Sequence, residues 1–258
     1  MKSAVTVVMA VYNGGGFLSC QVGSLLADLQ PQDEIVVIDD ASTDGSHDWL
    51  TRLGDPRIRV HRNPTNQGVR RAFESALSLA MNDIVFLCDQ DDEWLPGKRA
   101  AFVEAFARDA GCLVVVSDAQ LIDAESHVFG ESFMHTRGGF RSGFWANFVR
   151  NRYLGCAMAV RRSLLAAALP IPNRAPMHDM WLGMLGCLLG RVTYLPQPWL
   201  RYRRHSSNVS PSSRQPWRRV LAWRLNLLCA VTIRLAALAR RRIQRSGRAP
   251  GSEPHRLS

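Results

Sequence analysis

The carboxylates best placed to do chemistry in this sequence are crowded into one short run. Residues 89–92 read DQDD and directly follow the apolar stretch of residues 83–88, which predicts a strand with Asp89, Asp91 and Asp92 at its carboxyl end. Adjacent carboxylates repel one another unless a proton or a divalent ion neutralises them, and Mg²⁺ or Mn²⁺ prefers a few carboxylates together with phosphate oxygens. The run therefore predicts a metal site that faces a diphosphate, with a solvated loop or helix start as the alternative.

Strands and helices alternate along the first half of the chain, which predicts an α/β domain with a largely parallel sheet. We expect strands at residues 4–11, 34–38, 57–61, 84–88 and 112–117, and helices at residues 17–29, 44–53, 69–81, 96–108 and, later, 179–189. Ligands of open α/β sheets bind beyond the carboxyl ends of the strands. Because Tyr12, residues 39–44 and the acidic run each follow a strand, we expect them to face one site.

Two common phosphate-binding loops are absent from the sequence. Residues 13–17 read NGGGF, which lacks the Gly-x-Gly-x-x-Gly spacing of a dinucleotide site, and no Gly-Lys-Ser/Thr of a P-loop follows a strand. We therefore expect phosphate to be held by a metal ion and by side chains.

Length and charge predict one catalytic domain with a basic extension. The chain has 258 residues, enough for one substantial domain. Residues 1–200 carry 18 Lys and Arg against 21 Asp and Glu, whereas residues 201–258 carry 14 against 1. We expect a domain at residues 1–210, a basic amphipathic helical extension at residues 211–245 and a disordered tail at residues 246–258.

The basic extension predicts contact with an anionic surface. A helical pattern between residues 217 and 243 places a set of leucines on one side, namely Leu221, Leu225, Leu228, Leu235 and Leu238. Its apolar part is shorter than the roughly 20 residues of a membrane span and is interrupted by Arg234, so we expect the helix to lie in the interface of an anionic membrane. Docking on the domain or on a second subunit is the alternative, and nucleic acid is not expected.

Cysteines and the N-terminus favour a reducing compartment. The six cysteines are scattered, mostly in apolar runs, and none forms Cys-x-x-Cys, so we expect reduced thiols. Residues 4–11 are too short for a membrane span and no cleavage region follows them. We expect a cytoplasmic protein, peripheral at the cytoplasmic face of the membrane.

Taken together, the motifs resemble family 2 glycosyltransferases, and the later ones resemble the rhamnosyltransferase-like branch of that family. The segments that carry the resemblance are AVYN at residues 10–13, VIDDASTD at 37–44, NQGV at 66–69, LCDQDDEW at 87–94 with Lys98, GCAMA at 155–159, MHDMW at 177–181 and YRRHSSNV at 202–209. Each piece is weak alone, but their order and spacing are specific. The resemblance covers residues 4–210 and implies a GT-A fold, a nucleotide-diphosphate sugar and a divalent metal, Mn²⁺ or Mg²⁺.

The resemblance also implies roles on the donor side. Asp89 and Asp91 match the Asp-x-Asp signature, and which of Asp89, Asp91 and the adjacent Asp92 ligates the metal stays open. Asp39 or Asp40 resembles the acid that binds the base, which implies a UDP or dTDP donor, with helix capping as an alternative role. Further donor contacts are expected from Ala10, Tyr12, Gln90 and Arg70, and a further metal or diphosphate contact from His205.

On the acceptor side, an attacking hydroxyl must lose a proton, so a carboxylate has to stand opposite the leaving group. Asp179 opens a predicted helix and matches the position of the family's catalytic base, although the helix dipole alone would favour a carboxylate there. Acceptor contacts are expected from Asp118, Asn151, Gly155, Cys156, His178 and Trp181.

These roles imply an inverting, single-displacement transfer. The donor would be dTDP-rhamnose or another UDP- or dTDP-sugar, and the acceptor a lipid-linked or cell-surface glycan. Residues 215–219 read QPWRR, which is not the Gln-x-x-Arg-Trp of processive branches, so we expect one sugar per encounter. The alternatives are a polyprenyl-phosphate sugar transferase and a degenerate, non-catalytic sugar-nucleotide-binding membrane adaptor.

Overall fold

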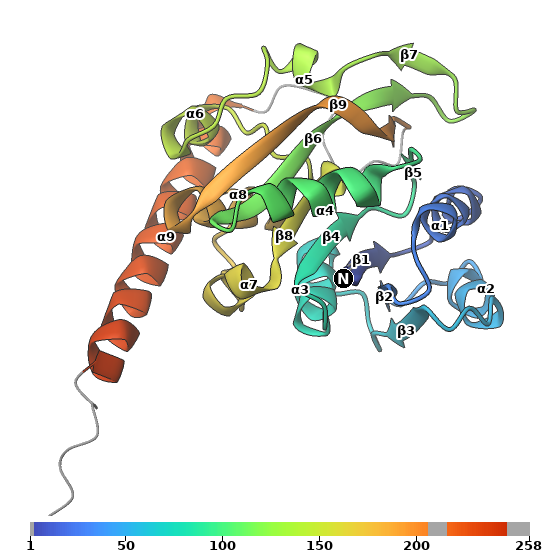
Figure 1. The fold of residues 1–258 in the computed structure, drawn as a ribbon, viewed down its shortest axis with the longest axis horizontal. Coiled ribbons are helices and arrows are strands. Elements are labelled where there is room, and N and C mark those ends of the chain that lie inside the picture. The colour runs from blue at the N-terminus through green and yellow to red at the C-terminus, as the bar shows by residue number, and fades with distance from the viewer. Residues whose placement is uncertain (1–2, 206–215, 247–258) are drawn as a thin grey trace, which may run out of the picture.

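The computed structural model describes residues 3–205 and 216–246, and Figure 1 shows their arrangement. The predicted domain boundary at residue 210 and the predicted tail at residues 246–258, apart from Ser246 itself, lie outside the described residues.

A single sheet runs through the described part of the chain in the order β3-β2-β1-β4-β8-β6-β9-β5, with β7 paired to β6. Its strands are β1 (Val5–Val11), β2 (Glu34–Asp39), β3 (Ile58–Arg62), β4 (Ile84–Cys88), β5 (Glu93–Trp94), β6 (Cys112–Ile122), β7 (Val128–Gly130), β8 (Met158–Arg161) and β9 (Arg191–Arg203). β1, β2, β3 and β4 are parallel, as predicted, and β8 pairs antiparallel with both β4 and β6. The α/β architecture and the mostly parallel sheet expected from the sequence are confirmed.

Helices cover both faces of the sheet. They are α1 (Phe17–Asp28), α2 (Ser46–Arg52), α3 (Val69–Ser78), α4 (Lys98–Arg108), α5 (Phe133–Thr136), α6 (Phe144–Val149), α7 (Arg162–Ala168), α8 (His178–Leu189) and α9 (Trp217–Ser246), with a 3₁₀ turn at Gly155–Ala157. Val7 and Met9 of β1 pack with α1, α2 and α4, whereas Val8 packs with α3, α7 and α8, because neighbouring residues of a strand point to opposite faces. This two-sided burial explains the continuous apolar strands.

The second half of the sheet was only partly predicted. β6 extends to Ile122, beyond the expected end at residue 117, because it pairs along its length with the parallel strand β9. That pairing brings Arg203 next to β5 and to Asp92, so the end of β9 lies against the acidic run.

The C-terminal helix α9 is confirmed, and one of its faces docks on the domain while part of the predicted leucine stripe stays exposed. Leu227, Ala230 and Val231 are buried against the domain, whereas Leu221 and Leu225 are exposed. The sequence pattern followed the leucine spacing, but the docked face is anchored by arginine as well.

Two arginines fix α9 to the domain. Arg234 donates hydrogen bonds to the carbonyls of Ala167, Leu169 and Pro170, at 2.7, 2.9 and 2.6 Å. Arg224 donates to the carbonyl of Val149 at 3.3 Å.

Residues Trp217–Arg241 are long and apolar enough to cross a membrane by length and composition alone, with a mean hydropathy of 1.5, which corrects the expectation of a shorter apolar segment. Only two charged residues interrupt residues 222–239, which is why the segment qualifies.

Close packing around α8 gives a first testable prediction. A Cβ at Gly183 would lie 2.5 Å from ring carbons of the buried Tyr153, so Gly183→Ala is expected to lower the free energy of unfolding by about 1–3 kcal/mol through overpacking. Gly23 of α1 has open space around its Cβ position, so Gly23→Ala is expected to stabilise the protein by about 0.5–1 kcal/mol. Urea unfolding of both variants measures the difference, and equal midpoints would contradict the packing.

Candidate functional site

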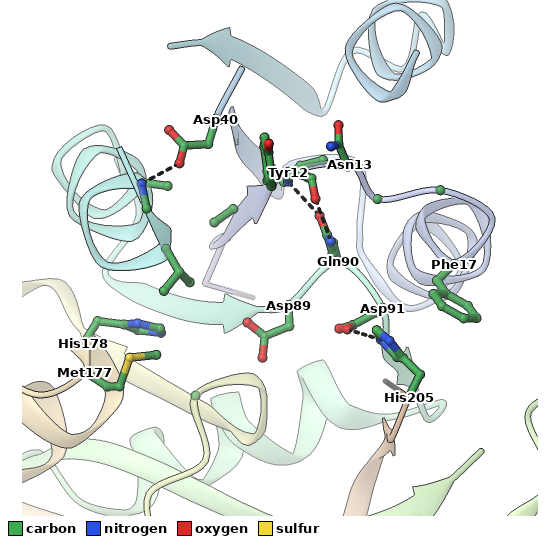
Figure 2. Close-up of a pocket in the computed structure, with 18 of the residues that line it drawn as sticks. Tyr12, Asn13, Phe17, Asp40, Asp89, Gln90, Asp91, Met177, His178 and His205 are labelled. Carbon is green, nitrogen blue, oxygen red and sulfur yellow. Dashed lines mark hydrogen bonds and ion pairs between the residues drawn. The ribbon is translucent and has the colours of Figure 1, made fainter. Parts of the chain in front are cut away.

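The carboxyl ends of the first strands open onto one cavity of about 780 Å³. Figure 2 shows that Tyr12, Asp89, Asp91, His178 and His205 converge on it from segments far apart in the sequence. The lining residues are Ala10, Val11, Tyr12, Asn13, Gly14, Gly15, Gly16, Phe17, Asp40, Asn66, Gly68, Val69, Ala72, Asp89, Gln90, Asp91, Leu154, Gly155, Met177, His178, Asp179, Tyr202 and His205. The size is that of a small-molecule site.

Gln90 joins the loops that follow β1 and β4. Its Oε1 accepts a hydrogen bond from the Tyr12 amide at 2.8 Å, and its Nε2 donates to the Tyr12 carbonyl at 3.1 Å. The Tyr12 side chain is about half exposed at the cavity wall, which leaves its ring available to a planar ligand. These two hydrogen bonds hold the Tyr12 backbone in a fixed position relative to the acidic run.

The two acids at the end of β2 have different environments. Asp40 lines the cavity and accepts hydrogen bonds from the Asn63 side chain and from the amides of Gln67 and Gly68, at 2.7–3.1 Å. Asp39 is fully buried outside the cavity lining, where it accepts from the Ser42 amide at 3.2 Å. Of the two alternatives left open by the sequence, only Asp40 faces the cavity.

β9 brings Arg203 and His205 to the acidic run. The fully buried Arg203 donates from its amide to Asp92 Oδ1 at 2.9 Å and from Nε to the Asp91 carbonyl at 2.8 Å, and it pairs with Glu93 at 2.5 Å. His205 Nε2 lies 2.8 Å from Asp91 Oδ2, a contact that Figure 2 marks with a dashed line. The fold therefore brings His205, for which a metal or diphosphate contact was expected, to the acidic run.

Burial and neighbouring charges shift the pKa values of the other two acids of the run, Asp89 and Asp92. Burial, followed by the charge of Asp92, raises the pKa of Asp89 well above its usual range. Burial, followed by the charge of Asp91, raises the pKa of Asp92 to about 7. Lys98 is fully buried beneath them and donates to the Cys156 carbonyl at 2.7 Å, and burial lowers its pKa to about 8. Burial and mutual repulsion thus favour the protonated forms of Asp89 and Asp92, and a bound cation would favour the ionised forms instead.

These residues fit a divalent cation. Asp91 and His205 line the cavity with an oxygen and a nitrogen 2.8 Å apart, and Mn²⁺ accepts both ligand types. Side-chain atoms of Asp89, Asp92 and Cys156 also lie within 4.8 Å of one another. Asp92 Oδ2 is a buried oxygen with no hydrogen-bond partner in the described part of the chain. The geometry places Asp91, His205 and Asp89 toward the cavity and Asp92 behind them.

On the opposite wall, the start of α8 presents Asp179 and His178. Burial raises the pKa of Asp179 to about 6, opposed by the nearby charge of Arg137, so the carboxylate titrates close to neutral pH. His178 is buried and stacked on Phe73 with ring centroids 3.9 Å apart, and burial lowers its pKa to about 3. Neither ring nitrogen of His178 has a hydrogen-bond partner among the described residues. A neutral imidazole that lines the cavity is therefore available to a ligand hydroxyl.

A glycine keeps this wall open. A Cβ at Gly155 would lie 3.1 Å from His178 Nε2 and 3.4 Å from the Asp179 Cβ, so a side chain there would push against both. The expected acceptor contact at Gly155 thus lines the cavity, while the adjacent Cys156 lies behind it with its thiol beside the acids.

Several expected contacts lie outside the cavity because hydrogen bonds engage them elsewhere. Arg70 donates to the carbonyls of Asn173 and Ala175, at 2.8 and 2.9 Å, where it fixes the segment before α8 instead of meeting a diphosphate. Asp118 accepts from Ser132 and from the amides of Ala119 and Met134.

Asn151 and Trp181 also have structural roles. The Asn151 side chain bonds to the backbone of Tyr153 at 3.1 and 3.3 Å. Trp181 is fully buried and donates from Nε1 to the Ala168 carbonyl at 2.9 Å, so it is a core residue instead of a sugar platform.

Phe17, Met177 and Tyr202 are among the cavity residues to which the sequence interpretation gave no role. The Phe17 ring packs against His205 with centroids 4.9 Å apart, and the Arg203 guanidinium lies 4.9 Å from the same ring. Phe17 reads as an ordinary first residue of a helix, and only the return of β9 makes it part of the site. Tyr202 belongs to a quoted motif, which was the available signal.

This geometry can be compared with known proteins. The family model described as glycosyl transferase family 2 matches residues 6–167, which include Asp39, Asp40 and the acidic run at residues 89–92. The chain belongs to this family. An uncharacterized glycosyltransferase of Nostoc sp. is 28% identical over 219 residues, covering 79% of this chain and 66% of the relative. The UDP-Glc:alpha-D-GlcNAc-diphosphoundecaprenol beta-1,3-glucosyltransferase WfaP of Escherichia coli is 31% identical over 94 residues, covering 36% of this chain and 38% of WfaP.

Solved structures of another protein share the fold. S. aureus TarS, residues 1–349 in complex with UDP-GlcNAc, superposes with a TM-score of 0.64 at 18% identity, over 82% of this chain and 62% of TarS. The family 2 domain therefore has a GT-A fold, as the resemblance implied. The chain spans less than two thirds of the length of the Nostoc relative and of TarS.

Proposed function

We propose that this family 2 protein is an inverting, non-processive glycosyltransferase that moves a sugar from a UDP- or dTDP-sugar, rhamnose being one candidate, to a cell-envelope glycan. The observation that carries the proposal is one cavity with an Asp91–His205 pair on one side and Asp179 on the other. The UDP-GlcNAc bound to TarS and the alpha-D-GlcNAc-diphosphoundecaprenol in the name of WfaP support the donor and acceptor classes.

The donor half of the cavity suits a pyrimidine nucleotide. Asp40 stands where it can accept a hydrogen bond from a ring imide, and Tyr12 offers a half-exposed ring for stacking. Both follow strands whose carboxyl ends meet at this edge, so the nucleotide would lie across β1 and β2 with its diphosphate over the acidic run.

A divalent ion would be held by Asp91 and His205, with Asp89 beside them. When bound, it supplies Lewis-acid stabilisation of the charge that develops on the leaving diphosphate. Arg203 and Gln90 contribute by fixing the acidic run in position, through hydrogen bonds from β9 and to β1.

Asp179 would take the proton from the acceptor hydroxyl as that hydroxyl attacks the anomeric carbon. Its pKa of about 6 keeps it mostly ionised at neutral pH while leaving it basic enough to accept a proton. Direct attack from the face opposite the diphosphate inverts the configuration and needs no covalent sugar-enzyme intermediate. The neutral His178 would orient the acceptor by accepting or donating one hydrogen bond.

The experiment that tests this function is hydrolysis and transfer of UDP- and dTDP-sugars with Mn²⁺, comparing the wild type with Asp91→Ala and Asp179→Ala. Donor turnover that depends on both residues supports the proposal. Equal background rates in all three proteins would indicate a non-catalytic adaptor instead.

We also propose that the protein is peripheral at the cytoplasmic face of the membrane, through one exposed surface. This surface, called here the α6/α9 surface, comprises the exposed side chains of Trp145 and Val149 on α6 and Leu221 and Leu225 on α9. The two helices lie side by side in Figure 1, and a hydrogen bond from Arg224 to the Val149 carbonyl joins them. Apolar side chains beside the arginines of α9 fit the interface of an anionic bilayer.

Membrane contact gives a second prediction. Leu225→Glu is expected to weaken binding to phosphatidylglycerol vesicles by about tenfold or more, because burying a leucine contributes about 1.5–3 kcal/mol and the new charge repels the surface. Met81→Glu is the matched control, since Met81 is 61% and Leu225 58% exposed, and Met81 lies away from α9. Co-sedimentation measures both, and equal binding of the two variants would contradict the assigned surface.

A further inference from the structure

Three arginines gather beside the acceptor wall of the cavity. Arg137 follows α5, Arg150 follows α6 and Arg204 follows β9, so three separate segments supply them. The Arg137 guanidinium lies 5.0 Å from the ring centre of Phe133, which meets the ring of Tyr202 edge-on at 5.7 Å.

The other two guanidiniums are tied to the same group of residues. Arg204 lies 5.7 Å from the Tyr202 ring centre and donates to the Tyr202 hydroxyl at 3.2 Å. Arg150 donates to the carbonyl of Thr136, the residue before Arg137, at 3.1 Å. Tyr202 itself lines the cavity, so the group, called here the arginine cluster, borders the site.

The arginine cluster has no salt-bridge partner among the described residues, and the charge of Asp179 acts on Arg137 from a greater distance. In residues 3–205 and 216–246, no carboxylate forms an ion pair with Arg137, Arg150 or Arg204. Partial burial, followed by the charge of Arg150 and, further on, of Arg204, lowers the pKa of Arg137. Like charges held together by the fold, against their mutual repulsion, are typical of an anion-binding site.

The arginine cluster lies near Asp179, the proposed base that the acceptor must reach. Arg137 is close enough to Asp179 for its charge to act against the rise in the pKa of that carboxylate. At its other end, Arg150 directly follows Val149, the exposed residue that α9 contacts. The cluster therefore lies between the proposed base and the α6/α9 surface.

We infer that Arg137, Arg150 and Arg204 bind a phosphate group carried by the acceptor. Phosphate offers several acceptor oxygens and up to two negative charges, which match the forked donors of more than one guanidinium better than a single carboxylate does. A phosphate between Asp179 and an apolar surface fits an acceptor whose sugar reaches the base while its other end lies at the membrane. The inference rests on the proposed function and names the acceptor class for the same site.

The test is calorimetric titration of the full chain with phosphate probes, with and without saturating UDP and Mn²⁺. Geranyl diphosphate represents a lipid diphosphate, bis(glycerol) phosphate represents a water-soluble phosphodiester, and geraniol represents the lipid without charge. The variant is Arg137→Gln with Arg150→Gln, both exposed. The control is Arg52→Gln with Arg108→Gln, which removes the same charge at exposed positions on α2 and α4.

We expect the variant to bind geranyl diphosphate about tenfold or more weakly than the wild type, the scale of a lost charge-assisted hydrogen bond, with the control unchanged and geraniol insensitive. Weakening confined to bis(glycerol) phosphate would support a water-soluble phosphorylated glycan instead of a lipid. Unchanged affinity in the variant, equal loss in the control, or no binding of either phosphate by the wild type would overturn the inference. UDP affinity, measured in the same proteins, tests the proposed donor site separately.

Discussion

Asp179→Asn is expected to lower the rate of sugar transfer by about 10²–10⁴-fold, the usual contribution of a general base. The amide keeps the shape of the carboxylate but cannot accept the proton of the attacking hydroxyl. UDP affinity is expected to stay within about twofold of the wild type, because Asp179 follows His178, which Figure 2 shows across the cavity from the Asp91–His205 pair. Steady-state kinetics and UDP titration measure the two effects.

The pH dependence of the same residue provides its control. Burial favours the protonated form of Asp179, backbone hydrogen bonds and the charge of Arg137 favour the ionised form, and the resulting pKa is about 6. Because only the ionised base accepts a proton, kcat/KM of the wild type should rise with pH up to about 6 and then level off. This rise of kcat/KM with pH should be absent in Asp179→Asn. A wild-type rate that falls over this range, or a full rate in the variant, would contradict the role.

Asp91→Asn is expected to weaken UDP binding in the presence of Mn²⁺ by about 10- to 100-fold, because an interaction with a charged group contributes about 1.5–3 kcal/mol. Asp91 and His205 lie 2.8 Å apart at the cavity, and the loss of either should reduce metal affinity. Free Mn²⁺, followed by its electron paramagnetic resonance signal, measures metal binding without any requirement for turnover.

Asp48→Asn is the matched control for this prediction, since Asp48 is an exposed carboxylate on α2 away from the cavity. It should leave Mn²⁺ and UDP binding unchanged. Identical Mn²⁺ binding by the wild type and Asp91→Asn would show that Asp91 is not a ligand, and the ion would then have to be held by Asp89 and Asp92.

The first half of the fold was predictable because local signals decide it. Continuous apolar strands that alternate with helices specify a parallel sheet, and the acids that end β2 and β4 must then meet at one edge. The pairing of β9 with β6 was not predictable in this way, since it joins residues about 80 positions apart with no local signal. His205 reaches Asp91 only through that pairing.

The acceptor side was predicted less well for a related reason. Asp179 and His178 line the cavity because α8 begins there, and Gly155 reaches it from the 3₁₀ turn, whereas Asp118 and Trp181 have polar groups engaged by backbone partners elsewhere. The sequence around Asp118 or Trp181 is the same whether the side chain faces a ligand or the core. Hydrogen-bond partners distinguish the two, and they depend on tertiary structure.

The central claim is that this cavity holds a pyrimidine nucleotide sugar with the help of a divalent ion. Calorimetric titration of UDP- and dTDP-sugars into the protein, with and without Mn²⁺, tests it most directly. Tight binding only with the ion, lost in Asp91→Asn and retained in Asp179→Asn, is the predicted result. Binding that ignores the ion and both substitutions, or no binding of either nucleotide sugar, would contradict the account.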